Sequence, residues 1–410
     1  MTPLEKIIIE KIKKEGPITF ETFMDMALYY PEFGYYTSPE TVIGRKGDFF
    51  TGPHLHPVFG AMIGKQLEEM WEIIGKPSDF YAVEIGAGAG YLCKDILDYL
   101  NRASLSNDKN DFLKSLRYVI VEPYVHFEEK QRELLCDYLK NISSPPPSPL
   151  SKGSNEGGIK WILSLKELQD IRGCILSNEL LDAFPVHLIE MEDNPPSPLP
   201  RGEGVRGRVK EIYVGFDGNN IIEQKLEINS PNVLNYLIEF KVDFQHGYRT
   251  EINLKIKDWL KEISEILFEG FVLTVDYGYA SKEYYDEERS KGTLLCYHKH
   301  QFNENPYEYI GEQDITAHVN FSSVKKWGEE LGFKTIGYCS QGTYLISLGI
   351  DELISELYSD STDYQSEILK IKGLILPQGM GESHKIMIQY KGSNLPKLKG
   401  FSLRNQAGIL

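Results

Sequence analysis

A run of alternating glycines near residue 86 is the first stretch whose residue types and spacing could bind a ligand. It reads Glu84-Ile85-Gly86-Ala87-Gly88-Ala89-Gly90; residues 80–83 before it are apolar, and residues 92–100 after it carry apolar side chains at helical spacing. A strand, a glycine turn and a helix bring the backbone close to a nucleotide-like ligand. The dinucleotide fingerprint Gly-x-Gly-x-x-Gly is not met, because its third glycine would fall at Tyr91. A purely structural turn is the alternative.

A carboxylate stands at the end of the next apolar stretch. Residues 118–121 read Tyr-Val-Ile-Val, and Glu122 follows directly. An acidic residue at the tip of the strand after a glycine turn can accept hydrogen bonds from both hydroxyls of a ribose. The polar stretch 101–116 accounts for a spacing longer than the roughly 20 residues of a compact dinucleotide unit. The glycine run and Glu122 together predict a site for an adenosyl ligand.

Acidic residues also follow two later buried stretches. Ser177-Asn178-Glu179-Leu180-Leu181-Asp182 comes after residues 174–176, and Asp276-Tyr277-Gly278 comes after residues 271–275. Polar residues at the carboxyl ends of parallel strands lie where doubly wound folds bind ligands. Glu179 and Asp182 are three residues apart and can face the same way. The alternative is a helix start, with Ser177 as N-cap and the acids at the positive helix end.

The elements that would position these residues alternate between strands and helices. Periodicity predicts parallel strands near residues 80–85, 118–121, 159–163, 174–176 and 271–275, a sixth strand at 333–338 and a last strand at 385–391. Helices are expected at residues 3–15, 19–28, 61–74, 233–240, 322–331 and 344–371, with a strand pair turning at 217–219. This alternation is typical of an α/β fold with a mostly parallel sheet.

Composition shifts suggest how the chain is divided. We expect an N-terminal helical and aromatic region at 1–78, a ligand-binding core at 79–392 with a β and helical insertion at about 209–267, and a C-terminal tail at 393–410. Two nearly identical Pro/Gly-rich peptides predict disordered inserts at 143–158 and 194–207, because such compositions bury too little apolar surface. The aromatic stretch 29–36 is either a packing clamp or one wall of a substrate cleft.

Composition also limits partners and compartment. The chain has 410 residues and a net charge of −16, which disfavours a nucleic-acid groove. No run of 18 apolar residues occurs, residues 1–14 lack signal or transit features, and five cysteines are scattered, so we expect a cytoplasmic protein with no membrane partner. His54 and His56 have no carboxylate at ligand spacing, so no metal site is predicted.

Taken together, these motifs resemble a known family. The run from Glu84 to Gly90 is similar to the first motif of class I S-adenosyl-L-methionine (SAM)-dependent methyltransferases, and the chain resembles the MidA-like methyltransferases, whose eukaryotic members are mitochondrial complex I assembly enzymes. The motifs that carry the resemblance are residues 29–31, 34–36, 47–51, 59–60, 84–90, 177–185, 276–278 and 314–321. The resemblance implies a Rossmann-like, mostly parallel seven-stranded sheet with an antiparallel final strand and helical N-terminal and inserted elements.

The resemblance also implies an activity and a site. The cofactor would be SAM, the product S-adenosylhomocysteine, and the acceptor an arginine of a protein substrate, modified to symmetric ω-N-dimethylarginine. The implied cofactor residues are Asp48, Phe49, Thr51, Glu84, Gly86, Gly88, Gly90, Glu122 and Asn178. The implied residues around the guanidinium are Asn178, Glu179, Asp182, Asp276 and Tyr277, with His318 along the approach.

Three other functions stay open from sequence alone. A methyltransferase could act on another nucleophile, although the Asn-Pro-Pro-Tyr motif of nucleobase enzymes is replaced by Ser177-Asn178-Glu179-Leu180. A nicotinamide oxidoreductase is disfavoured by Tyr91. An assembly chaperone that holds SAM as a structural ligand also fits. The substrate, the number of methyl groups transferred and the oligomeric state, monomer or dimer, are left open.

Overall fold

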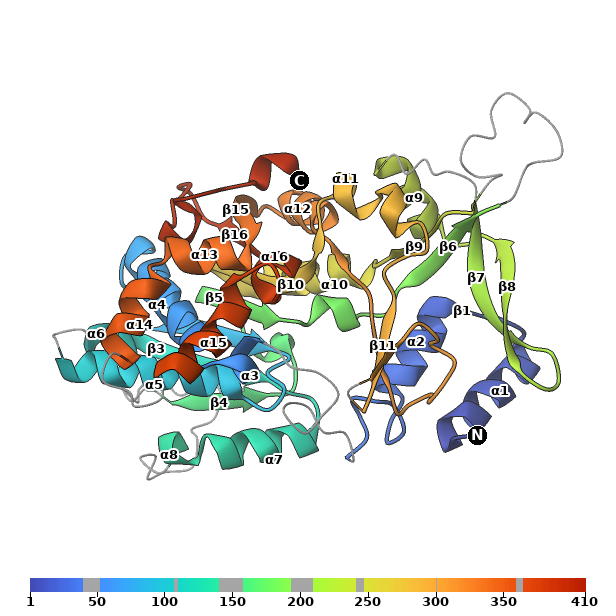
Figure 1. Ribbon diagram of the computed structural model, residues 1–410, viewed down its shortest axis with the longest axis horizontal. Coiled ribbons are helices and arrows are strands. Elements are labelled where there is room, and N and C mark those ends of the chain that lie inside the picture. Colours follow the sequence, from blue (N-terminus) through green and yellow to red (C-terminus); the bar gives the residue numbers. More distant parts are fainter. Residues whose placement is uncertain are drawn as a thin grey trace. The chain divides into compact units, whose positions relative to one another are not determined.

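The computed structural model describes residues 1–39, 52–106, 110–139, 158–192, 209–240, 247–299, 301–358 and 364–410. The chain forms two compact units (Figure 1). The first comprises Met1–Phe49, Leu181–Trp259 and Gly278–Val324, and the second comprises Phe50–Leu180, Leu260–Tyr277 and Lys325–Leu410. The expected insert at 194–207 lies outside the described residues, as does the insert at 143–158 except for Gly158.

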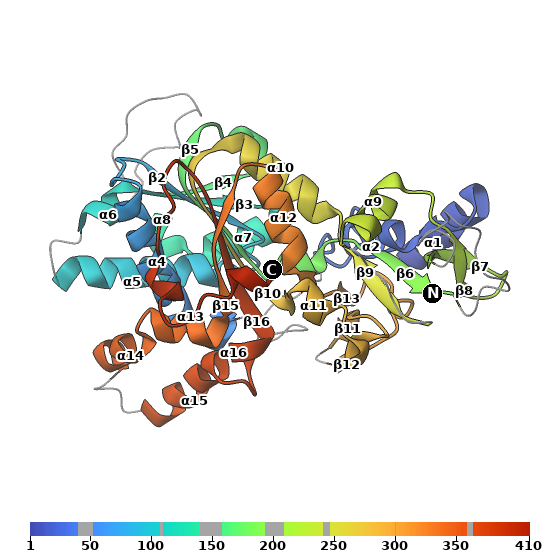
Figure 2. The ribbon, with the colours of Figure 1, turned by 90° about the horizontal axis from the view of Figure 1, so that it is seen from above.

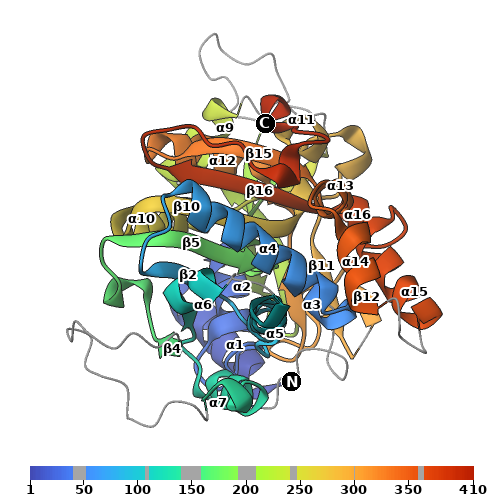
Figure 3. The same cartoon turned by 90° about the vertical axis from the view of Figure 1, so that its left-hand side faces the viewer.

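A mainly parallel sheet forms the centre of the second unit (Figure 3). Its strands are, in spatial order, β15 (Lys334–Ser340), β16 (His384–Lys391), β10 (Leu267–Tyr279), β5 (Ile171–Asn178), β2 (Phe80–Ile85), β3 (Leu116–Val121) and β4 (Ile159–Ile162). The strands from β10 to β4 are parallel, and β16 is antiparallel to both of its neighbours. The last two residues of β10 belong to the first unit, where they pair with β14 (Val319–Asn320). The expected class I methyltransferase fold is confirmed.

Helices flank this sheet. They are α3 (Gly52–Leu55), α4 (Val58–Ile73), α5 (Tyr91–Ser106), α6 (Asn110–Ser115), α7 (Val125–Leu134), α8 (Cys136–Leu139), α13 (Gln341–Ser347), α14 (Ile350–Tyr358), α15 (Tyr364–Ile375) and α16 (Met380–Ser383). Short 3-10 turns are η1 (Leu165–Glu167), η5 (Lys399–Phe401) and η6 (Ala407–Ile409). α4 and α5 pack closely because Gly60 has no Cβ, which would lie 2.4 Å from the Asp95 Cβ. The single helix expected at 344–371 is wrong: Gly349, with φ of 82°, separates α13 from α14.

Two antiparallel sheets form the first unit. One runs β1 (Ile18–Thr19), β7 (Val209–Phe216), β6 (His187–Met191), β9 (Arg249–Ile252), with β8 (Ile221–Glu227) paired to β7. The other runs β12 (Gln301–Asn303), β11 (Leu295–His298), β13 (Asp314–Thr316). The expected turn between β7 and β8 is confirmed, and the Asp217 carboxylate accepts the Asn219 backbone N–H at 2.8 Å. α10 (Lys255–Ile266) and α12 (Phe321–Glu330) each contain residues of both units.

The helices of the first unit are α1 (Pro3–Glu15), α2 (Phe20–Tyr29), α9 (Pro231–Glu239) and α11 (Ser281–Tyr284), with the 3-10 turns η2 (Leu181–Ala183) and η4 (Glu287–Arg289). α1 and α2 lie against β6 and β7 (Figure 2), and they share a core that includes Ile8, Phe23 and Ile212. The predicted N-cap of α2 is confirmed: the Thr19 hydroxyl accepts the Thr22 backbone N–H at 3.1 Å.

The aromatic stretch after α2 packs within the first unit. The Tyr36 hydroxyl donates to Asp314 Oδ1 at 2.9 Å, and the Tyr29 hydroxyl donates to the Ala183 carbonyl at 3.0 Å. The Tyr29 and Tyr36 rings stack with centroids 5.5 Å apart, and Tyr35 is buried. These contacts support the packing interpretation, while a role as a wall of a substrate cleft stays a prediction.

No described helix combines the length and apolarity needed to cross a membrane. Within the described ranges, no three His, Cys, Asp or Glu side chains gather as a metal site would require. All five cysteines are free thiols, of which Cys136 is exposed and the others are buried.

Candidate functional site

The glycine run forms a tight turn between β2 and α5. Gly86, Gly88 and Gly90 have φ values of 73°, 53° and 88°, in the left-handed region that side chains with a Cβ rarely adopt. The Gly90 N–H donates to the Ala87 carbonyl at 2.8 Å and closes the turn. A Cβ on Gly86 would lie 2.8 Å from Leu180 Cδ1. The predicted strand, turn and helix are confirmed, and the glycines are required by the backbone conformation itself.

Gln131 of α7 connects this turn to Glu122. Its amide nitrogen donates to the Gly88 carbonyl at 2.8 Å and to Glu122 Oε2 at 2.9 Å, and its amide oxygen accepts from the Trp161 indole at 2.8 Å. The side chain is buried, so these hydrogen bonds are shielded from water. No sequence motif singles out Gln131. Only its place on the buried face of α7, the helix that follows Glu122, could have indicated it.

Glu122 lies at the carboxyl end of β3. Its Oε1 accepts the Tyr124 backbone N–H at 3.1 Å, and its own N–H donates to the Ile162 carbonyl at 2.9 Å. Burial raises the pKa of this carboxyl to about 7, although the hydrogen bonds from Tyr124 and Gln131 oppose the shift. Each carboxylate oxygen has accepted one hydrogen bond and retains capacity for another. The side chain can therefore accept from a vicinal diol.

Glu84 lies inside β2, two residues before the turn begins at Gly86. It is 3% exposed, and its Oε2 accepts the Tyr118 hydroxyl at 2.6 Å. Burial, with a smaller contribution from the charge of Glu122, raises the pKa of Glu84 to about 7. The contact observed for Glu84 is with β3. A contact with the ammonium group of a ligand stays a prediction.

The raised pKa of Glu84 predicts a pH-dependent stability. Its folded pKa of about 7 exceeds 4.5, the ordinary pKa of a glutamate, so the folded state binds more protons between those pH values and stability falls as pH rises through them. Between pH 5 and 7.5, we expect the free energy of unfolding to fall by about 2 kcal/mol more in the wild type than in Glu84→Gln. Urea unfolding at both pH values measures this difference, and parallel pH profiles would contradict it.

The predicted carboxylates of β5 and β10 lie at the same edge of the sheet. Asn178 is in register with Val275, and the Asn178 amide nitrogen is 3.4 Å from Glu179 Oε1. Asp276 is fully buried; its Oδ2 accepts the Leu180 N–H at 3.2 Å and its Oδ1 accepts the Tyr277 N–H at 2.9 Å. The helix-start alternative is wrong, because Ser177 is a buried residue of β5.

Glu179 adopts an unusual backbone conformation. Its φ is 49°, in the left-handed region, and its N–H donates to the Val275 carbonyl at 2.8 Å. For a residue with a Cβ this conformation costs roughly 1 kcal/mol or more. Such strain gathers at sites where a side chain must point in a particular direction. The strain therefore marks Glu179 as a candidate for function.

His384 is a further member of this cluster, and no sequence motif marks it. Its Nε2 lies 3.6 Å from Glu179 Oε1, its Nδ1 lies 3.0 Å from the Ser383 hydroxyl, and its ring centroid is 5.5 Å from that of Tyr277. His384 is the first residue of β16, and because β16 is antiparallel, its amino end pairs with the carboxyl end of β10. The sequence feature that could have indicated this residue is its position immediately before the last predicted strand, at 385–391.

Asp182 and His318 belong to the first unit. The Asp182 carbonyl accepts the Ala317 N–H at 2.9 Å, and the His318 N–H donates to the Thr293 hydroxyl at 3.0 Å. Both stay predictions as site residues. The predicted cofactor residues Asp48, Phe49 and Thr51 lie outside the described residues.

The two histidines of the 54–56 stretch have contacts within the second unit. His56 Nε2 lies 2.7 Å from Glu367 Oε2, and its Nδ1 accepts the Val58 N–H at 3.0 Å at the start of α4. Burial lowers the pKa of His56, against the opposing effect of Glu367. The His54 ring contacts the Tyr91 ring at 4.9 Å. His56 thus connects α15 to the start of α4.

The second unit therefore carries two chemically distinct groups at the carboxyl edge of its sheet. The glycine turn with Glu122 presents backbone and a hydroxyl acceptor, which fits an adenosyl ligand. Glu179 and Asp276 present anionic oxygens, which fit a planar cation such as a guanidinium.

Comparison with known proteins identifies the family of the chain. Residues 62–339 match the family described as S-adenosyl-L-methionine-dependent methyltransferase. A protein of Burkholderia thailandensis, solved as a crystal structure bound to S-adenosyl-homocysteine, is 26% identical to the chain with a TM-score of 0.81, over 99% of this chain and 96% of that one. The native crystal structure of a Burkholderia thailandensis protein of the same superfamily gives 25% identity and a TM-score of 0.80, with the same coverage.

Curated relatives span nearly the whole chain. The Drosophila melanogaster protein named protein arginine methyltransferase NDUFAF7 homolog, mitochondrial, is 26% identical over 404 residues, which cover 95% of this chain and 85% of the relative. The Homo sapiens protein arginine methyltransferase NDUFAF7, mitochondrial, is 27% identical over 392 residues, 93% of this chain and 82% of the relative.

Proposed function

The chain belongs to this family of SAM-dependent methyltransferases, and on that basis we propose that it methylates the guanidinium of an arginine in a protein substrate, giving symmetric ω-N-dimethylarginine. Relatives named as protein arginine methyltransferases, matched over more than nine-tenths of the chain, support the choice of acceptor. The structural observation that supports it most is the placement of Glu179 and Asp276 at the carboxyl edge of the sheet.

SAM is the cofactor, and when bound it supplies a methyl group carried on a sulfonium sulfur. Glu122 would accept hydrogen bonds from the ribose hydroxyls, since its carboxylate oxygens retain acceptor capacity. The glycine turn would leave space for the methionine portion, with Glu84 near its ammonium group. The other residues that we assign to the cofactor are Asp48, Phe49, Thr51 and Asn178.

The residues of this chain would mainly align the acceptor. Methyl transfer requires the nitrogen, the methyl carbon and the sulfur to lie in line. A pair of carboxylates that fixes the plane of the guanidinium would therefore contribute much of the rate acceleration. Glu179 and Asp276 would accept its N–H groups, with Asn178 and Tyr277 beside them in the second unit. A role for Asp182 at the guanidinium rests on the sequence motif alone. Glu179 Oε1 would take the proton that the nitrogen releases, and His384 Nε2, 3.6 Å away, would share it.

Cofactor affinity should depend on pH through Glu122. Only the ionised carboxylate can accept from both ribose hydroxyls, and the pKa of Glu122 in the unliganded protein is about 7. The dissociation constant for SAM should therefore rise below pH 7, by up to about tenfold for each pH unit. Calorimetric titrations from pH 5.5 to 8.5 measure this, and Glu122→Gln should bind weakly with a flatter profile. A wild-type constant that does not change with pH would contradict the assignment.

The proposed function can be tested with methyl-labelled SAM and a lysate of cells that lack the protein. Label should appear in one or a few protein bands, and peptide mass spectrometry should place it on arginine. Glu179→Gln at equal concentration is the matched control and should give no labelled band. Label found in nucleic acid or in small amines would show that the methyl acceptor is not a protein arginine, and would contradict the proposed function. If SAM binding is intact without any labelled product, the protein would be an assembly chaperone.

A further inference from the structure

The first unit contains a cavity of about 610 Å³ that the proposed chemistry does not use. Its walls come from β6, β8 and the start of β9, from residues 289–295 and 304–307, and from His318. Apolar side chains such as Leu188, Leu294 and Pro306 line one part, and charged side chains line another. Both the size and the mixed lining are typical of a binding pocket.

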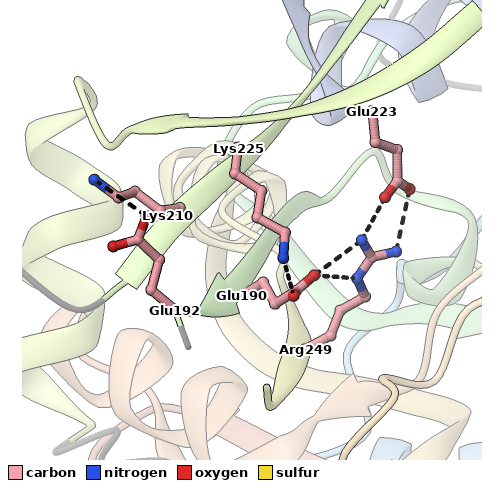
Figure 4. A network of polar contacts seen from close by, with 6 residues as sticks. All are labelled: Glu190, Glu192, Lys210, Glu223, Lys225 and Arg249. Carbon is pink, nitrogen blue, oxygen red and sulfur yellow. Dashed lines mark hydrogen bonds and ion pairs between the residues drawn. The ribbon is translucent and has the colours of Figure 1, made fainter. Parts of the chain in front are cut away.

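The carboxylates of β6 and β8 in this cavity are already neutralised. Figure 4 shows the Arg249 guanidinium between Glu190 and Glu223. Its Nη2 lies 3.0 Å from Glu190 Oε2, and its Nη1 and Nη2 donate bidentate hydrogen bonds to the two carboxylate oxygens of Glu223. Lys225 reaches Glu190 Oε1 at 2.5 Å, and the Tyr307 hydroxyl donates to Glu223 Oε1 at 2.9 Å. Because Glu190 and Glu223 are already paired, they would attract a cationic ligand only weakly.

Two cations of the cavity have no acidic partner within the described part of the chain. The Arg289 guanidinium lies over the Tyr279 ring, 3.8 Å from its centroid, and its Nη1 donates to the Glu283 carbonyl at 2.8 Å. Stacking and one hydrogen bond hold the planar guanidinium of Arg289 in place, and its remaining N–H groups can donate to a ligand. Lys291 is exposed and makes no ion pair with any described residue. Of the three carboxylates that line the cavity, the exposed Glu304 alone makes no ion pair with a described residue.

A buried glutamate fixes the segment that carries Lys291. Glu251 is 2% exposed and accepts from the Thr293 backbone N–H at 2.8 Å and the Thr293 hydroxyl at 3.0 Å. Gly292 has φ of 84°, and a Cβ there would lie 2.2 Å from Glu251 Oε1. The Arg249 N–H also donates to the Ser290 carbonyl at 2.8 Å. Residues 290–293 thus hold a defined shape, which reduces the cost of ordering the site on binding.

We propose that this cavity binds an acidic side chain of the protein substrate. A carboxylate matches the planar Arg289 fork, and the Lys291 ammonium adds a second positive charge. Because the whole chain carries a net charge of −16, non-specific attraction of an acidic segment to its surface is weak. The inference rests on the proposed function only in taking the ligand to be a protein.

Binding without SAM tests this inference separately from catalysis. The probe is a fluorescein-labelled peptide with four glutamates between glycines, compared by anisotropy with the same peptide carrying four glutamines. We expect binding of the glutamate peptide only, weakening with added salt. Lys291→Glu should weaken it at least about tenfold by charge reversal. Glu304→Gln should strengthen it. Lys282→Glu is the matched control, an exposed lysine of the same unit outside the cavity lining, and should bind as the wild type does.

Three results would overturn the inference: equal affinity for the two peptides, equal affinity of Lys291→Glu and Lys282→Glu, or binding of citrate without binding of the glutamate peptide. Once a protein substrate is in hand, Lys291→Glu should raise its KM and leave kcat unchanged, since the cavity acts on binding alone. Failure of arginine methylation with peptide binding intact would refute the proposed function and leave this site standing.

Discussion

Exchanging Glu179 for glutamine is expected to slow methyl transfer at least roughly a hundredfold, the usual cost of removing one electrostatic contact from a transition state. Glutamine keeps the size of the side chain but removes the charge that would hold the guanidinium and accept its proton. The variant should still bind SAM, because the glycine turn and Glu122 are untouched. Single-turnover transfer from labelled SAM measures the rate, and calorimetry measures the affinity.

Glu262→Gln is the matched control for that variant. Glu262 is an exposed carboxylate of α10 in the second unit, so its loss should leave both the rate and the SAM affinity unchanged. A Glu179→Gln enzyme that methylates at the wild-type rate would remove Glu179 from the guanidinium site. The same variant separates an enzyme from an assembly chaperone, since only an enzyme should lose its cellular role.

The Gly88→Val substitution should abolish detectable SAM binding. Gly88 has φ of 53°, where a β-branched residue is strained, and its carbonyl accepts the hydrogen bond that connects the turn to Gln131. A valine there would displace the turn and fill the space that the backbone leaves for the methionine portion. Calorimetry with SAM should show no heat of binding at concentrations that saturate the wild type.

Gly332→Val controls for strain alone. Gly332 lies between α12 and β15 of the second unit with φ of 88°, and a Cβ there meets nothing within 4 Å. It should lower the melting temperature as Gly88→Val does, yet keep SAM affinity. Wild-type affinity in Gly88→Val would refute the placement of the cofactor at this turn.

Much of the fold could be predicted because its strands are short apolar runs that end in polar residues. The stretches around Val83, Val119 and Val275 all form parallel strands of one sheet. The helix expected at 344–371 failed at Gly349, since apolar periodicity continues across a glycine that the backbone uses to change direction. How separate segments gather into the first unit could not be seen either, because that depends on packing between distant parts of the chain.

The site was predictable where residues follow one another in sequence and missed where they meet only in space. Glu122 and the glycines are marked by their strands, so local patterns found them. Gln131 and His384 come from elements with other roles, and only the fold brings them to Glu122 and Glu179. The left-handed conformation of Glu179 also has no local sequence signal, because a glutamate is not a residue that favours it.

The most direct test of the central claim is the chemical identity of the methylated residue. The band labelled by the wild type and absent with Glu179→Gln should be hydrolysed with acid, and its methylated amino acids separated against standards. We expect the label to migrate with symmetric ω-N-dimethylarginine. Label on lysine, on a carboxyl group or on any other nucleophile would contradict the guanidinium assignment of Glu179 and Asp276, while leaving the SAM-dependent methyltransferase fold in place.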